Sequence, residues 1–126
     1  KLKYLSKAND GRRRAAALYD KLLAGTPGVT LPVEAAYGRS IYHVYAIRVA
    51  QRDAIMQRMT ERGIGTGIHY PVPVHLQNAY ANLGGKKGDF PVSEACGDSF
   101  LSLPMFPELT DQQIETVVKE LKASLN

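Results

Sequence analysis

The sequence predicts an α/β fold in which a small β-sheet is covered by helices. Three observations support this prediction. The chain has 126 residues, the usual size of one domain. Patterns typical of helices and of strands alternate along it with short connections. The last of these patterns is a strongly amphipathic helix. We therefore expect a single domain over residues 1–126, in the order helix, strand, helix, strand, helix, strand, helix.

The first helix is predicted over residues 6–24, where alanine and leucine recur at helical spacing. Gly25-Thr26-Pro27-Gly28 ends it. We predict one long helix; Asn9-Asp10-Gly11, three poor helix formers in succession, are its weak point, and a break near its start is the alternative. A short extended piece over residues 29–32 follows.

The central strand is predicted over residues 41–49, which are rich in β-branched and aromatic side chains and contain neither Gly nor Pro. His43 lies on the apolar face of that strand, and we interpret it as a structural residue.

Residues 52–62 show the pattern of an amphipathic helix that Gly63 ends. Residues 64–68 alternate as a short strand whose glycines allow a backbone or a ligand to come close.

The second half of the chain begins with a stiff loop. Prolines at alternate positions of residues 69–75 exclude both a helix and ladder pairing. A short helix over residues 75–83 and a glycine turn over residues 84–88 follow.

Two further helices and one strand complete the prediction. Asp89-Phe90-Pro91 opens a helix, and residues 101–104 form the strand after it. Thr110 and Gln113 make a capping box at the start of the last helix. Each helix carries an apolar face: Val92, Ala95, Cys96 and Phe100 on the first, and Ile114, Val117, Val118, Leu121 and Leu125 on the second.

Composition excludes several classes of protein. The hydrophobic fraction of 44% and the charged fraction of 22% are typical of globular chains. No apolar run approaches the roughly 20 residues that span a bilayer, and no signal peptide opens the chain, so we expect a soluble cytoplasmic protein without a membrane partner. The single cysteine, Cys96, excludes an internal disulfide and is expected in the core.

The net charge of +4 raises the question of nucleic-acid binding. Arg12, Arg13 and Arg14 form the tightest basic cluster. Successive side chains on a helix point about 100° apart, so this cluster spreads around the helix and forms no stripe along a phosphate backbone. We expect no nucleic-acid partner.

The candidate site is the segment from Gly65 to Gln77, which contains His69, Tyr70, His75 and Gln77. A metal site would need a third and usually a fourth ligand, which the segment lacks. A general acid or base would need an orienting carboxylate, which the loop also lacks. The remaining readings are a rigid loop that recognises a sugar or nucleotide, and a stiff surface connection.

The residues around this loop resemble those of a known family. Gly63-Ile64-Gly65-Thr66-Gly67-Ile68-His69-Tyr70-Pro71, then Pro73 and His75-Leu76-Gln77, is similar to the DegT/DnrJ/StrS sugar aminotransferases. The similarity continues in order through Arg12-Arg13 with Tyr19, Tyr42-His43-Val44-Tyr45, Phe90-Pro91-Val92 with Glu94 and Ala95, Leu101-Ser102-Leu103-Pro104-Met105, and Leu109-Thr110 with Gln113-Ile114.

The resemblance implies the small C-terminal domain of a fold-type-I transferase that uses pyridoxal phosphate (PLP) and aminates nucleotide-linked keto sugars in polysaccharide biosynthesis. Residues 1–28 would be its connecting helix and turn. In that family the Schiff-base lysine and the phosphate-binding residues belong to a large domain, and no lysine here lies in a matching segment. We therefore expect that the PLP-binding large domain is absent, that this chain holds no cofactor, metal or catalytic residue, and that it is inactive alone.

The resemblance also implies the partners. These are the PLP-binding large domain, a second copy in a homodimer, and a nucleotide-sugar substrate over which this domain closes. The substrate-binding residues would be His69, Tyr70, His75 and Gln77. The alternative is a stand-alone, non-catalytic binding or regulatory module that reuses the fold.

Overall fold

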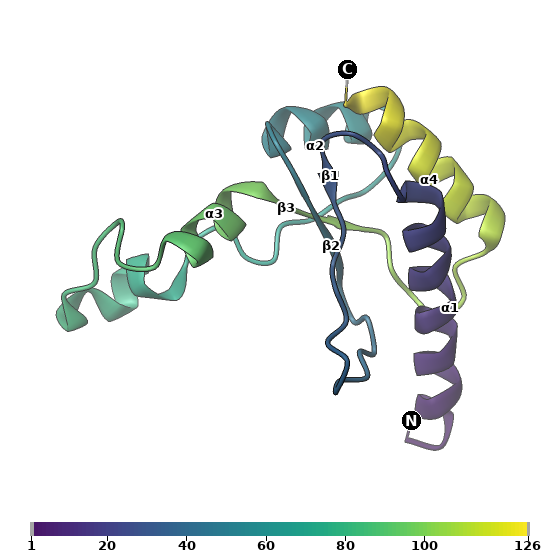
Figure 1. Ribbon diagram of the computed structural model, residues 1–126, viewed down its shortest axis with the longest axis horizontal. Helices are drawn as coiled ribbons and strands as arrows, with labels where there is room; N and C mark the ends of the chain where they lie inside the picture. The colour runs from purple at the N-terminus through teal and green to yellow at the C-terminus, as the bar shows by residue number, and fades with distance from the viewer. Residues whose placement is uncertain (1, 126) are drawn as a thin grey trace.

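A three-stranded antiparallel sheet lies at the centre of the computed structural model of the protein, which describes residues 2–125 (Figure 1). Its strands are β1 (Val29–Thr30), β2 (Tyr45–Val49) and β3 (Phe100–Leu103), in the order β1-β2-β3. Val29 pairs with Val49, and Tyr45 pairs with Leu103. At the other edge of β3, Gly67 makes a single antiparallel bridge with Ser102. The predicted α/β class is confirmed.

Three helices cover one face of this sheet: α1 (Leu5–Leu23), α2 (Arg52–Glu61) and α4 (Asp111–Ser124) (Figure 1). A short 3-10 helix, Leu2–Tyr4, precedes α1. Helix α4 packs against both α1 and α2. The core lies between the sheet and these helices, and its largest fully buried apolar side chains are Tyr19, Leu23, Tyr45, Ile47, Met59, Leu101, Ile114 and Leu121.

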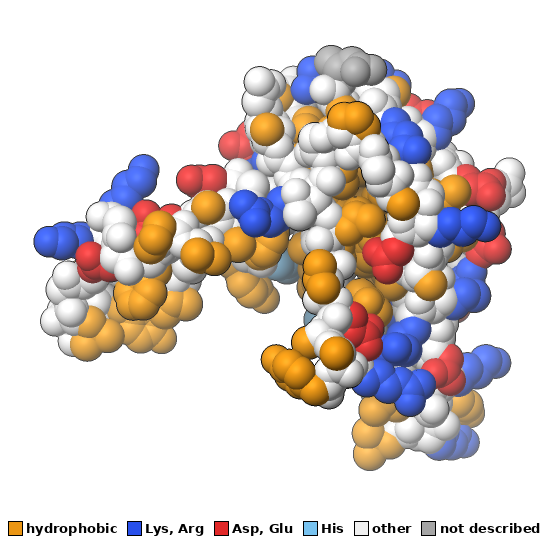
Figure 2. All heavy atoms as spheres, viewed as in Figure 1, with side chains coloured by type: hydrophobic (Ala, Val, Ile, Leu, Met, Phe, Trp, Pro, Cys, Tyr) orange, Lys and Arg blue, Asp and Glu red, His pale blue; other side chains and the backbone are white. Residues whose placement is uncertain are grey.

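Residues 71–99 project away from the sheet and are called the arm (Figure 1). The arm contains two 3-10 helices, Val74–Leu76 and Asn78–Leu83, and helix α3 (Pro91–Ser99). Its apolar side chains are largely exposed and form orange patches in Figure 2. They include Val72, Val74, Tyr80, Leu83, Phe90 and Val92.

The apolar face expected on α3 is not a core face. Val92 is 76% exposed. Cys96 is only partly buried, so its prediction as a core residue is wrong. The buried residue of α3 is Gly97, where an added Cβ would lie 3.1 Å from the carbonyl oxygen of Pro71. Close backbone packing therefore holds α3 to the start of the arm.

Helix α1 runs without interruption through Asn9-Asp10-Gly11, so the predicted long first helix is confirmed and the alternative of a break is not. A tertiary contact accounts for the glycine in this segment. A Cβ at Gly11 would lie 2.5 Å from the carbonyl oxygen of Pro107, closer than any real side chain approaches. The missing side chain lets the segment before α4 cross directly over α1.

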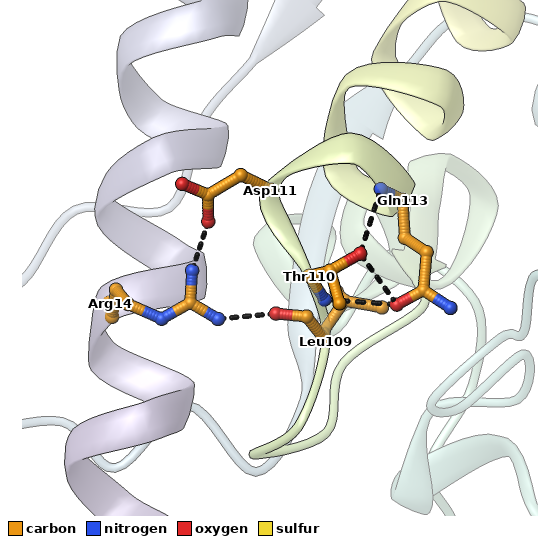
Figure 3. Close-up of polar contacts among 5 residues, drawn as sticks. All are labelled: Arg14, Leu109, Thr110, Asp111 and Gln113. Carbon is orange, nitrogen blue, oxygen red and sulfur yellow. Dashed lines mark hydrogen bonds and ion pairs between the residues drawn. The ribbon is translucent and has the colours of Figure 1, made fainter.

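The junction between α1 and α4 is held by polar contacts (Figure 3). Arg14 donates hydrogen bonds to the carboxylate of Asp111 and to the carbonyl of Leu109. The capping box at Thr110 is confirmed. The backbone amide of Gln113 donates to Thr110 Oγ1 at 3.3 Å, and the backbone amide of Thr110 donates to the side-chain Oε1 of Gln113 at 2.9 Å.

The rest of the basic cluster also contacts the chain itself. Arg12 donates to the carbonyl of Ile41 at 3.3 Å, and Arg13 donates to the carbonyl of Ser40 and pairs with Glu34. These contacts attach the loop of residues 31–44 to α1.

None of the helices described in residues 2–125 combines the length and the apolar character that a membrane span requires.

Several boundaries differ from the sequence prediction. The central strand begins at Tyr45 and not at residue 41, because Tyr42 has a left-handed backbone with φ of 45°. The strand expected over residues 64–68 is reduced to the Gly67 bridge. The short helix expected over residues 75–83 is instead the pair of 3-10 helices in the arm.

Candidate substrate-binding site

The outer face of the sheet, opposite the core, forms the floor of the candidate site. Tyr45, Ile47 and Val49 alternate toward the core and are buried. By the same alternation Ala46 and Arg48 point to the outer face. Their partners across the ladders share that face because directly paired residues lie on one side of a sheet. These partners are Ser102 for Ala46, and Phe100 and Thr30 for Arg48.

Ser102 anchors the candidate loop to this face. Its backbone amide donates to the Gly67 carbonyl at 2.8 Å, and its carbonyl accepts from the Gly67 amide at 3.0 Å. Its side-chain Oγ lies 2.9 Å from Nδ1 of His69. A Cβ at Gly67 would lie 3.0 Å from Cε1 of His69, so a larger residue at this position would require the imidazole ring to shift.

His69 and Tyr70 are both exposed, and Tyr70 is 74% exposed. Their rings meet edge to face with centroids 5.5 Å apart. The peptide bond between them is cis. Both side chains are accessible at the end of residues 64–68, although that segment is not a regular strand.

Two open hollows meet at His69. The larger, of about 430 Å³, has the outer sheet face as its floor and Leu31, Pro32, His69 and Tyr70 at its rim. The smaller, of about 370 Å³, lies on the other side of His69. Both volumes fall within the range of small-molecule sites. Figure 2 shows histidine atoms in the hollow between the arm and the 31–44 loop.

His43 lines the smaller hollow and is exposed. The interpretation of His43 as a residue on the apolar face of the central strand is therefore wrong, because the strand starts two residues later. Thr66 lines the same hollow, and its Oγ1 is buried with no hydrogen-bond partner among the residues described.

His75 and Gln77 lie in the arm and do not line either hollow. Nε2 of His75 lies 3.0 Å from Oε1 of Glu94, and its ring packs on Phe90 with centroids 4.8 Å apart. Gln77 Nε2 donates to the carbonyl of Val72 at 3.3 Å. The substrate role stays a prediction for all four residues, and the contacts separate His69 and Tyr70 from the other pair.

Glu94 is the orienting carboxylate that the loop sequence lacks, and it comes from α3. Burial alone would raise the pKa of Glu94. Hydrogen bonds from the Gly88 amide, His75 and the Phe90 amide outweigh burial and hold that pKa below its usual value. The carboxylate is therefore ionised at neutral pH and holds three segments of the arm together.

Sequence reasoning missed Arg48 and Ser102. An outward-pointing arginine in an apolar strand is an ordinary surface residue, so its pattern carries no functional signal. Ser102 lies in a short apolar segment, and only the pairing with Gly67 shows that it meets His69.

The residues described do not fit PLP by themselves. The cofactor needs a lysine for its Schiff base. Every described lysine has an exposed side chain, and none lines either hollow: Lys3, Lys7, Lys21, Lys86, Lys87, Lys119 and Lys122. Over the same residues, no three His, Cys, Asp or Glu side chains gather as a metal site would require.

The structure defines a small α/β domain in which α1, α2 and α4 pack on one face of the sheet and the two open hollows lie beside the other face. The chain belongs to the DegT/DnrJ/EryC1/StrS aminotransferase family, whose model matches residues 1–122.

Similar proteins agree with this membership. The chain is 40% identical over 123 residues to the erythromycin biosynthesis sensory transduction protein EryC1 of Saccharopolyspora erythraea, covering 98% of this chain and 34% of that protein. It is 38% identical to the dTDP-3-amino-3,4,6-trideoxy-alpha-D-glucose transaminase of Streptomyces venezuelae, covering 97% and 32%. The chain spans about a third of the length of the curated relatives it matches.

Solved structures show the same fold. The S. venezuelae DesV structure in complex with a ketimine intermediate superposes with a TM-score of 0.93 at 38% identity, covering 97% of this chain and 33% of that one. A Brucella abortus aminotransferase of the same family gives a TM-score of 0.87 at 31% identity, covering 97% and 32%.

Proposed function

We propose that this chain is the C-terminal domain of a PLP-dependent aminotransferase that acts on nucleotide-linked keto sugars, and that it forms the substrate-side wall of the active site. The single observation that carries the proposal is the loop bearing His69 and Tyr70. It is attached to β3 through Ser102, and both side chains are exposed beside the open sheet face. A fixed loop with exposed polar and aromatic groups suits a sugar or nucleotide, because little ordering entropy is lost on binding.

The names of relatives support the substrate class. One is a transaminase of a dTDP-linked amino sugar, and another is a UDP-N-acetyl-3-dehydro-alpha-D-glucosamine aminotransferase of Acidithiobacillus ferrooxidans, 36% identical over 123 residues. The shared feature of these substrates is a nucleotide joined to a hexose.

The cofactor chemistry belongs, in this proposal, to the rest of a longer enzyme. The absence of a lysine from the lining of both hollows supports that assignment. The exposed apolar side chains of the arm support a partner surface, either the large domain or the second subunit of a homodimer. We propose in the same way that the complete enzyme is soluble and lies in the cytoplasm.

The alternative is a binding or regulatory module without catalysis. Its support is in names only: EryC1 is called a sensory transduction protein, and a Geobacillus stearothermophilus relative, 39% identical over 123 residues, is called a pleiotropic regulatory protein. Transamination by the full-length protein that contains this domain decides between the two.

The test of the binding loop is Tyr70→Phe in that full-length protein. Loss of one hydroxyl contact is expected to weaken binding of the nucleotide sugar about three- to tenfold, with unchanged thermal stability and unchanged absorbance of the bound cofactor. Tyr80→Phe, on the exposed arm, is the matched control and should bind normally. A Tyr70→Phe protein that loses about 1–3 kcal/mol of stability but keeps its affinity would make the loop structural.

A further inference from the structure

Arg48 is the only charged residue among those that line the larger hollow. Its Nε donates to Oγ of Ser99 at 3.2 Å, which orients the guanidinium. Within residues 2–125, no hydrogen bond or ion pair uses its two terminal nitrogens. By contrast, Arg13, Arg14 and Arg52 bind carbonyl or carboxylate oxygens of this chain. Arg48 therefore presents unused donors to the hollow.

His69 presents a second donor at the rim of the same hollow. The Ser102 side chain is buried, and its only hydrogen bond in the described chain is to Nδ1 of His69. If Nδ1 carried the proton, the hydroxyl hydrogen of the 5% exposed Ser102 would have no acceptor among residues 2–125, which is costly. The satisfied arrangement has Ser102 donating to Nδ1, so the ring proton is on Nε2. No described residue accepts that proton.

The charge that lines the site is all of one sign, which is positive. No Asp or Glu lines either of the two hollows beside His69. The planar guanidinium fork matches the spacing of two oxygens on a phosphate or carboxylate. The imidazole N–H of His69, which lines the same hollow, adds a second donor, and the exposed Tyr70 ring lies next to His69.

We propose that Arg48 and His69 form an oxyanion-binding site on the open face of the sheet, with Ser102 as the positioning residue for His69. The ligand class is a phosphate or carboxylate group of the substrate. Resting on the proposed function, the site would take either the diphosphate of the nucleotide sugar or the carboxylate of the amino donor. The two sources share the same chemistry and differ in charge and shape.

The experiment is an NMR titration of the ¹⁵N-labelled 126-residue chain with inorganic pyrophosphate and, separately, with glutamate. Saturable shifts are expected for the Gly67 and Ser102 amides and for the His69 ring. Arg48→Gln is expected to weaken binding about tenfold or more, and Arg48→Lys to recover only part of it, because lysine keeps the charge and loses the fork. Whichever of the two anions binds more tightly identifies the source.

The matched control is Arg39→Gln, which removes the same charge from an exposed arginine outside the hollow. Equal weakening by Arg39→Gln would show attraction to net charge alone and would overturn the site. Absence of any saturable shift with both anions would overturn it as well. Dispersion of the amide spectrum checks that each variant is folded.

A second readout tests the positioning role of Ser102. The ¹⁵N shifts of the His69 ring should show the proton on Nε2 in the parent chain, and Ser102→Ala should mix the two tautomers. A ring with its proton on Nδ1 in the parent chain would contradict the assignment. Neither measurement uses a sugar or a catalytic reaction. A negative result would therefore overturn the oxyanion site without deciding whether the proposed function is correct.

Discussion

Nε2 of His75 lies 3.0 Å from Oε1 of Glu94, and the same carboxylate accepts hydrogen bonds from the Gly88 and Phe90 amides. One side chain of α3 thus joins the stiff loop, the glycine turn and its own helix start. This relationship explains why the arm keeps a defined shape although most of its apolar side chains are exposed.

We expect the arm to loosen in acid. The pKa of Glu94 is lowered in the folded chain, so its contribution to stability is present above the unfolded pKa of about 4.3 and is lost as the pH falls through the folded pKa. The protection factor of the Gly88 amide, which compares its exchange rate with that of an unstructured amide at the same pH, should fall over that range. Glu94→Gln should exchange quickly already at neutral pH, whereas Glu115→Gln on α4 should behave as the parent. An unchanged Gly88 rate in Glu94→Gln would contradict this role.

Gly11→Ala is expected to destabilise the chain although alanine is the better helix former. Helix propensity alone would favour alanine by about 1 kcal/mol. The new Cβ would lie 2.5 Å from the Pro107 carbonyl oxygen. Relieving that clash should lower the free energy of unfolding by a net amount of about 1–3 kcal/mol. Urea unfolding measures the difference. Asp10→Ala, at an exposed neighbour, should be neutral or slightly stabilising.

The opposite outcome for Gly11→Ala, a gain in stability, would mean that the segment at Pro107 shifts away without cost. The fold would then tolerate a larger separation between that segment and α1, and the close crossing would not be required for stability.

The N-cap threonine of α4 and a threonine within that helix should respond differently to replacement by alanine. Thr110→Ala removes the N-cap hydrogen bond to Gln113 and should cost about 1 kcal/mol. Thr116 only returns its hydroxyl to the carbonyl of Gln112 within the helix, so Thr116→Ala should be neutral or slightly stabilising. Thermal unfolding of both variants makes the comparison, and equal losses would show that the cap contributes nothing specific.

We expect no single lysine of the chain to capture PLP. The described lysines are exposed and lie away from the hollows, so each should react weakly and without preference. Borohydride reduction of a PLP mixture, followed by peptide mass spectrometry, measures the adduct at each site. A stoichiometric adduct at one described lysine would contradict our proposal that cofactor binding belongs to the rest of a longer enzyme.

The sequence by itself determined the α/β class, the order of the main helices and the last helix with its capping box. These features depend on local periodicity and on the chemistry of residues three apart, such as Thr110 and Gln113. It also placed the exposed pair of His69 and Tyr70 on a stiff loop, because alternate prolines restrict the backbone wherever they stand. The family was readable from the same segment.

Only the tertiary structure decided which of the candidate side chains share a site. His75 meets Glu94 across nineteen positions of sequence, and His69 meets Ser102 across thirty-three. Pro107 crosses α1 directly at Gly11, and Arg48 lines a hollow on the side of the sheet opposite α1, α2 and α4. Such contacts depend on how strands pair and how segments cross, and no pattern within a window of neighbouring residues contains that information.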